Sequence, residues 1–227
     1  MSKSHPPRRR LTAAARREVI ETAAAAVFAE RGYHGASIDE IARRSGITAP
    51  VVYDHFDSKI ALYRRLLERT RDELLEMWMN SLPGDEPASV RIPRALDAWA
   101  AYVQEHPFAP RQFFHETTGE PEIQAIHREV QAQATVALGA ILGAEPGADA
   151  IAGPGEEELQ MAAEVMRAGL TGLAIWWSEH PNVPRERIVA TAVNAVWIGF
   201  ERVSRGERWT PSHAPGPRGA SAGSPPA

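Results

Sequence analysis

The side chains of this chain that could do chemistry are basic ones in its first third, and the chemistry that they offer is the binding of anions. Residues 1–71 hold 14 Lys and Arg against 8 Asp and Glu, a net charge of +6, whereas residues 72–227 hold 11 against 21, a net charge of −10. A basic segment on an acidic body is typical of a nucleic-acid surface joined to a part with another task. The basic residues around the motif discussed below are Lys3, Arg8, Arg9, Arg10, Arg16, Arg17, Arg43, Arg44 and Lys59.

The residue types that most catalytic and metal sites need are missing or wrongly spaced. The sequence has no Cys, which excludes disulfides, thiolate metal sites and thiol nucleophiles and fits a reducing cytoplasm. None of its eight His residues stands three positions after a Glu, the spacing that helical di-metal sites use. We therefore expect no catalytic residue, no metal and no cofactor. A helical-bundle enzyme is the alternative, which a turnover assay would reveal.

Residues 37–56, SIDEIARRSGITAPVVYDHF, have the pattern of two short helices joined by a glycine turn. Ser37 and Glu40 have the spacing of a capping box, which predicts the start of the first helix. Gly46 can adopt the positive φ of a tight turn and so ends it. Thr48 is expected to cap the second helix, whose first turn tolerates the proline that follows. The pattern predicts a helix-turn-helix, and its alternative is an ordinary helical hairpin.

The rest of the chain also predicts helices, so the expected fold is all-α. Apolar residues recur at helical spacing after Thr12, and Gly32 is placed to end that helix in a left-handed turn. No run of alternating β-branched residues suggests a strand. No stretch approaches the roughly 18 apolar residues of a membrane-spanning helix, so we expect a cytoplasmic protein with no membrane partner. Further helices are expected over 57–81, 88–106, 110–117, 120–143, 156–179 and 184–205.

The motif and the helix before it resemble the DNA-binding part of TetR-family transcriptional repressors. The matching residues are Ala29-Glu30-Arg31-Gly32-Tyr33, Ser37-x-x-Glu40-Ile41-Ala42, Gly46-Ile47 and Val52-Tyr53-Asp54-His55-Phe56-Asp57-Ser58-Lys59, and Ile60 departs from a position where the family often has Glu. The resemblance covers residues 12–75. It implies a helix-turn-helix DNA-binding domain over 12–74 and a helical effector-binding and dimerisation domain over 75–205. The last 22 residues, 206–227, contain 5 Pro and 4 Gly with few apolar anchors and are expected to form a disordered tail.

The resemblance also implies which residues contact DNA. Phosphates would be held by Ser37, Tyr53, His55 and Lys59, and base edges in the major groove would face Thr48, Ala49, Pro50 and Val51. Few of the second group donate hydrogen bonds, so contacts with thymine methyl groups and readout of DNA shape would matter. Arg43 and Arg44 would contact DNA or else lie on a solvated face. The alternative for Tyr53 is a position in the core instead of a phosphate contact.

An aromatic and methionine-rich set in the second part predicts either a core or a small-molecule cavity. The family resemblance favours a cavity for an apolar or aromatic effector, with polar side chains to orient it. The expected effector residues are Met77, Trp78, Trp99, Tyr102, His106, Phe108, Arg111, Phe113, Phe114, His115, Met161 and Met166.

The two last helices carry a wide apolar stripe, and the family resemblance implies that they form the interface of a homodimer. The alternative is the core of a monomer. A helix-turn-helix normally works as a two-fold dimer, because one short helix contacts few bases. The expected interface residues are Gly169, Gly172, Leu173, Trp176, Trp177, Val196, Trp197 and Phe200. The expected function is a ligand-released repressor on a palindromic double-stranded operator. A DNA-bending protein without sequence choice or effector is the alternative.

Overall fold

The computed structural model describes residues 12–109, 120–144, 156–199 and 202, and every regular element within these ranges is helical. The all-α prediction is therefore confirmed. The predicted helix over 110–117 and the tail from residue 206 lie outside the described residues. The elements are α1 (Ala13–Gly35), α2 (Ile38–Ser45), α3 (Ala49–Tyr53), α4 (Lys59–Ser81), α5 (Ala88–Glu105), α7 (Pro121–Gly143), α9 (Glu156–Glu179), α10 (Arg185–Ala192) and the π-helical turn η1 (Val193–Trp197).

The short helices begin and end largely at the predicted residues. The Thr12 hydroxyl accepts a hydrogen bond from the Ala15 N–H at 3.2 Å and caps α1. Gly32 interrupts that helix with φ 67°, and Gly46 caps α2 with the same φ. The prediction for Thr48 is wrong, because its side chain makes no capping bond. Pro50 occupies the second helical position, which removes one of the N–H groups that a cap accepts from.

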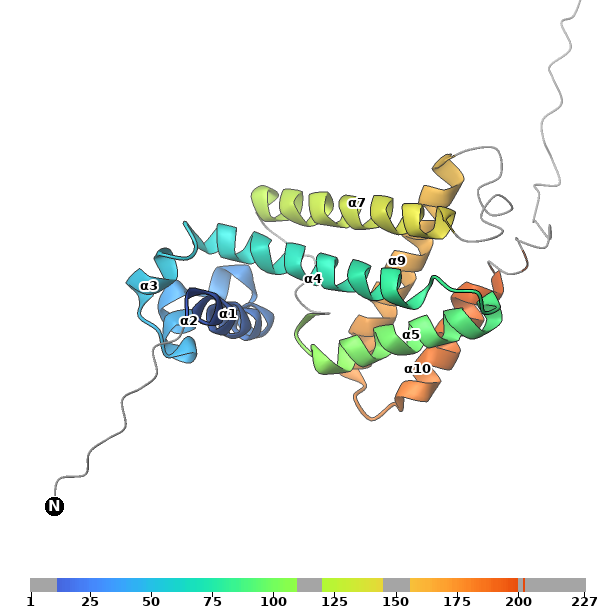
Figure 1. Ribbon diagram of the computed structural model, residues 1–227. Coiled ribbons are helices and arrows are strands. Elements are labelled where there is room, and N and C mark those ends of the chain that lie inside the picture. The colour runs from blue at the N-terminus through green and yellow to red at the C-terminus, as the bar shows by residue number, and fades with distance from the viewer. Residues whose placement is uncertain (1–11, 110–119, 145–155, 200–201, 203–227) are drawn as a thin grey trace, which may run out of the picture.

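Helices α1 to α3 and the first half of α4 form a head with its own hydrophobic core (Figure 1). That core also contains Ile123, Ile126 and Val130 from the start of α7. Residues on both sides of the boundary predicted at 74 and 75 therefore contribute to it.

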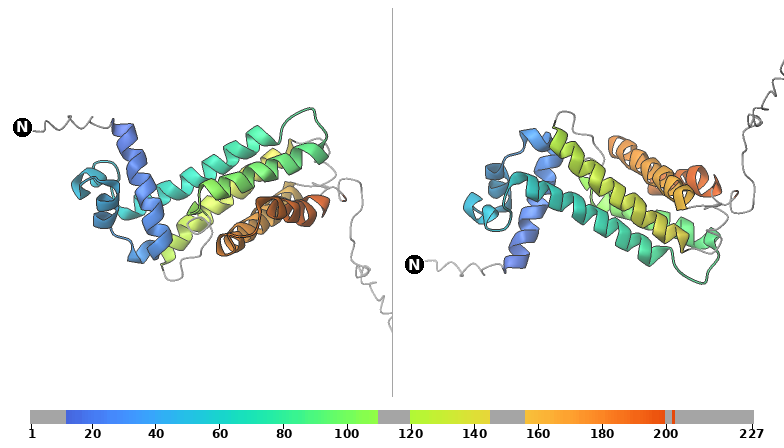
Figure 2. Two further views of the ribbon diagram at one scale, coloured as in Figure 1. Left: turned by 90° about the horizontal axis from the view of Figure 1, so that it is seen from below. Right: turned by 90° about the horizontal axis from the view of Figure 1, so that it is seen from above.

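The remaining helices form a body around a second core. It includes Trp78 and Leu82 of α4, Trp99 of α5, Leu170 of α9 and Ile188 of α10. Helix α4 is the element that both cores share, and its 23 residues extend about 34 Å at 1.5 Å per residue. The two views of Figure 2 show α7 alongside α4, with α9 and α10 on the outer side of the body. Among the described helices, none combines the length and the apolarity that crossing a bilayer requires.

Candidate nucleic-acid interface and ligand cavities

One face of the head presents the predicted contact residues to solvent. Val52 and Phe56 are buried and anchor α3 in the head core. Pro50 is exposed and Tyr53 is 53% exposed, so Tyr53 is not a core residue. The other predicted contact residues lie on the same short helices or beside them. Ser37, Arg43 and Thr48 are exposed, whereas Ala49, Val51 and His55 are half-buried.

The two adjacent arginines of α2 have different surroundings. The Arg43 side chain is 72% exposed and lies 3.6 Å from the Glu40 carboxylate. Arg44 instead donates two hydrogen bonds, of 2.8 and 2.6 Å, to the Glu30 carboxylate of α1 and further bonds to Glu40. The Arg44 guanidinium therefore ties α2 to α1, a structural role that the sequence did not predict. Those bonds raise the pKa of Arg44, and they hold the pKa of Glu30 below its ordinary value.

Glu40 departs from the reciprocal capping box that the sequence predicts. The Ser37 hydroxyl accepts a hydrogen bond from the Glu40 N–H at 3.2 Å, which is the expected half of the motif. The Glu40 carboxylate turns toward arginines instead and lies 2.9 Å from both Arg31 and Arg44. It thus gathers guanidinium groups from α1 and α2 and leaves Arg43 as the most exposed of them.

Lys59 has a structural role that the sequence did not indicate. Its ammonium group donates to the carbonyl oxygens of Tyr33 and Ala36, at 2.8 and 3.1 Å, and lies 4.2 Å from the centre of the Tyr33 ring. These contacts hold the segment between α1 and α2 against the start of α4. Two of the three ammonium protons are used in this way, which leaves one donor for a phosphate.

The head core joins α4 to α7 through a buried polar contact. The Tyr63 hydroxyl lies 2.8 Å from Nε2 of His127, and burial raises the pKa of Tyr63 to about 12. The Tyr63 ring also packs edge-on against Phe28 and Tyr33 of α1. Three helices therefore meet at one tyrosine, which sequence spacing did not reveal because the partners lie far apart along the chain.

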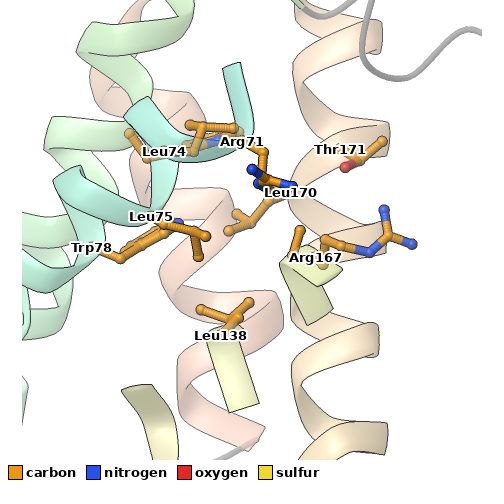
Figure 3. Close-up of a pocket in the computed structure, with 10 residues that line it drawn as sticks. Arg71, Leu74, Leu75, Trp78, Leu138, Arg167, Leu170 and Thr171 are labelled. Carbon is orange, nitrogen blue, oxygen red and sulfur yellow. The ribbon is translucent and has the colours of Figure 1, made fainter. Parts of the chain in front are cut away.

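The predicted effector residues do not gather in one place. Trp78 and Trp99 line a small cavity of about 50 Å³ inside the body, here called the central cavity. Figure 3 shows Leu75 and Trp78 of α4, Leu138 of α7 and Leu170 of α9 around it. The sequence missed Arg71 and Arg167, which belong to the same wall. Arg71 donates to Gln133 and Asp72, and Arg167 donates to Glu164 and Thr135.

A second, larger cavity of about 380 Å³ takes another part of the predicted set. Tyr102, His106 and Phe108 line this space between α1, α4 and the end of α5, here called the junction cavity. None of the three predicted methionines lines either cavity. Met166 and Met77 pack in the body core, and Met161 is 59% exposed on α9. Arg111, Phe113, Phe114 and His115 lie outside the described residues.

The predicted interface residues divide between the surface of α9 and the body core. Gly169, Gly172 and Trp176 are exposed, and Leu173 packs partly against the body core. The prediction for Trp177 is wrong, because it is buried and its indole N–H donates to the Val183 carbonyl at 2.9 Å. The side chains of Val196 and Trp197, and all of Phe200, lie outside the described part of the chain.

Comparison with known proteins finds similarity to bacterial transcriptional regulators. Residues 20–66 match the family described as bacterial regulatory proteins, tetR family. The chain is 27% identical over 194 residues, 83% of its length and 84% of the relative, to the transcriptional activator FasR of Mycolicibacterium smegmatis. It is 33% identical over 85 residues, 37% of its length and 41% of the relative, to the transcriptional repressor BepR of Brucella suis.

Two solved structures extend the likeness in fold to most of the chain. A putative transcriptional regulator from Pseudomonas aeruginosa superposes with a TM-score of 0.68 at 20% identity, covering 88% of this chain and 97% of that one. FadR from Bacillus subtilis, solved in complex with stearoyl-CoA, superposes with a TM-score of 0.62 at 19% identity, covering 83% and 98%.

Proposed function

We propose that the chain is a TetR-family transcriptional regulator rather than an enzyme, and that it is a cytoplasmic repressor that binds a palindromic operator as a homodimer. The match of residues 20–66 to the tetR family and the similarity to FasR support this proposal. The observation that carries the proposal is the exposed face of α2 and α3. Pro50 and Tyr53 face solvent while Val52 and Phe56 anchor the same helix in the core. Such a short helix, supported from beneath, can enter the major groove of DNA.

The surface divides into a base-reading part and a phosphate-binding part. Thr48, Ala49, Pro50 and Val51 meet base edges, mainly through apolar contacts and DNA shape. Ser37, Arg43, Tyr53 and His55 hold phosphates on either side. Lys59 contributes mainly by ordering the segment before α2, as its bonds to the Tyr33 and Ala36 carbonyls support.

A second copy of this chain is the partner that fits the outer face of α9. Met161, Val165 and Trp176 are 59, 66 and 44% exposed, a large apolar load for residues of one helix on a free surface. A Cβ atom added to Gly169 or Gly172 would meet nothing within 4 Å, so another helix can approach the backbone there. Pairing through α9 would also bring two heads together, as a palindromic operator requires.

The central cavity is the proposed effector site, and its size supports a mechanism of release. Its volume of about 50 Å³ lies well below the roughly 300–1,000 Å³ of ordinary ligand pockets. An effector must therefore displace α4 from α7 and α9. Because α4 also carries part of the head core, the displacement changes how the two heads are spaced. A coupling of roughly 1–3 kcal/mol would lower operator affinity about 5- to 150-fold.

The lining of the central cavity favours an apolar effector with a polar or anionic end. Leucine and tryptophan side chains supply the apolar wall, and Arg71 and Arg167 supply positive charge beside it. The complex of the Bacillus subtilis FadR structure with stearoyl-CoA is of this chemical type and supports the choice of probe.

Selection of genomic fragments at low ionic strength, with random duplex as competitor, tests the proposal. We expect retention of a few palindromic fragments and their release by stearoyl-CoA but not by free coenzyme A. Retention of random duplex alone would favour the DNA-bending alternative, and no retention would overturn the proposal. A reporter fused to the selected promoter gives the direction of regulation. Deletion of the gene should raise expression for a repressor, whereas lowered expression would indicate an activator, as FasR is named.

A further inference from the structure

The junction cavity is bounded by both the head and the body. Its walls come from Glu21 and Thr22 of α1, from Leu66 and Arg69 of α4, and from Tyr102 near the end of α5. Its volume of about 380 Å³ falls within the range of ordinary ligand pockets. It shares no lining residue with the central cavity. It is therefore a separate space, in which a bound molecule would touch both α1 and the end of α5.

A chain of hydrogen bonds crosses this cavity from the head to the body. The Arg69 guanidinium donates to the Glu21 carboxylate at 3.0 Å and to the Glu73 carboxylate at 2.7 Å. The second oxygen of Glu73 accepts a hydrogen bond from the Tyr102 hydroxyl at 2.8 Å. Glu21 belongs to α1 and Tyr102 to α5, so Arg69 and Glu73 of α4 link the DNA-binding head to the body.

The charge around the cavity is negative. Its lining has the carboxylates Glu21, Glu73 and Glu105 against one arginine, Arg69. A surface groove that shares Glu21, Arg69 and Glu73 with the cavity adds three more carboxylates and two arginines. Those additional residues are Glu18, Asp72, Glu76, Arg17 and Arg65. The cavity and the groove together contain six acidic and three basic side chains, a negative balance that favours a positively charged occupant.

Aromatic rings supply the other part of the site. The rings of Tyr102 and His106 stack with centroids 4.1 Å apart, and both residues line the cavity. Phe108 also lines the cavity and is 39% exposed. Aromatic faces next to carboxylates attract organic cations through both charge and the ring quadrupole.

We propose that the junction cavity binds a small organic cation with an aromatic or compact apolar body. Its ammonium group lies among the carboxylates of Glu73 and Glu105, and its apolar body contacts Tyr102, His106 and Phe108. The bound ligand contacts α1, α4 and α5 together. It therefore changes how the head packs against the body. This consequence for operator binding rests on the proposed function, whereas the binding of the cation does not.

Titration calorimetry with the full chain, in the absence of DNA, tests the binding step. The probe is 2-phenylethylammonium, and its uncharged counterpart is 2-phenylethanol. We expect the cation to bind roughly tenfold more tightly than the alcohol, since charge and cation–π attraction act only on the former. Equal affinity for the two compounds, or no heat from either, would overturn the proposal.

Two substitutions locate the site. Glu105→Gln removes an exposed carboxylate at the rim, and Phe108→Ala removes an exposed ring, so neither disturbs a core. Each should weaken binding of 2-phenylethylammonium severalfold. Asp85→Asn, in a different cavity at the far end of α4, is the matched control and should leave the affinity unchanged. Unchanged binding by both cavity variants would show that the cation binds elsewhere and would overturn the assignment.

The effect on DNA is measured separately with an operator fragment. We expect the cation to change operator affinity in the wild type and to lose this effect in Glu105→Gln. If calorimetry detects the cation but the chain binds no DNA, the proposed function fails while the ligand site stands. If DNA is bound but no cation is, the ligand site fails alone.

Discussion

The Tyr63 hydroxyl and Nε2 of His127 are 2.8 Å apart in the core of the head, although 64 positions separate the two residues in the sequence. The contact joins α4 to α7 at the depth where α1 also packs against Tyr63. Helix α7 runs from this point back to the wall of the central cavity, to which it contributes Leu138. The head and the proposed effector site are thus connected by α7 as well as by α4.

Tyr63→Phe should lower the free energy of unfolding by about 1–3 kcal/mol, the cost of removing one partner of a buried polar contact. Urea denaturation measures the loss. Tyr53→Phe is the control, because Tyr53 is exposed and its substitution should leave stability unchanged while weakening operator binding. Equal stability of the Tyr63 variant and the wild type would contradict the importance given to this contact.

Lys59→Met should destabilise the head, because the carbonyl oxygens of Tyr33 and Ala36 lose a charged donor. We expect a loss of about 1.5–3 kcal/mol for hydrogen bonds to a charged group. Thermal unfolding followed by circular dichroism detects it, and operator binding should weaken as a result. A variant with wild-type melting but weaker DNA binding would restore phosphate contact as the main role of Lys59.

Arg43→Gln and Arg44→Gln are a matched pair on one helix, and we expect the first to weaken DNA binding and the second to lower stability. The Arg43 variant should keep its melting temperature and bind the operator less tightly, with a salt slope reduced by about one unit. The Arg44 variant should lose stability, because Glu30 and Glu40 lose their partner. Fluorescence anisotropy over a salt series, together with melting curves, separates the two, and an unchanged salt slope for Arg43→Gln would refute its phosphate contact.

The Glu30–Arg44 ion pair makes a pH-dependent contribution to stability. The hydrogen bond from Arg44 holds the pKa of Glu30 below its ordinary value of 4.5. A carboxyl with a lowered folded-state pKa stabilises the protein above the unfolded-state pKa, and this stabilisation disappears as pH falls through the folded-state pKa. The melting temperature of the wild type should therefore exceed that of Glu30→Gln at neutral pH, and the two should converge in acid. A difference that grows on acidification would contradict this sign.

Val165→Arg should produce a monomer, since it places a charge on the exposed apolar face of α9. Analytical ultracentrifugation measures the change, and Val90→Arg is the control on α5. Both valines are largely exposed, 66% for Val165 and 48% for Val90, so neither substitution should unfold the chain. A Val165→Arg dimer of normal stability would exclude α9 as the interface.

Features that depend on near neighbours along the chain could be predicted without the structure. The cap at Thr12, the left-handed turns at Gly32 and Gly46, and the helices of the described residues follow from local propensity. The exposure of Thr48 and Pro50 was also expected, because the family resemblance places both residues against DNA. The prediction that Thr48 caps α3 is wrong for a local reason, because Pro50 removes an N–H donor from the first turn of the helix.

Which polar and aromatic groups meet depends on the packing of the helices and could not be predicted from local patterns. Lys59 and Arg44 carry the positive charge typical of DNA-contacting residues. In the structure, however, they bind a carbonyl and a carboxylate that are distant in the sequence. The predicted effector set divides between two cavities for the same reason. Trp78 and Tyr102 are both aromatic residues of helices. They line different cavities because the faces of α4 and α5 that they occupy pack against different helices. Side-chain partners depend on how helices cross, which periodicity along one helix does not specify.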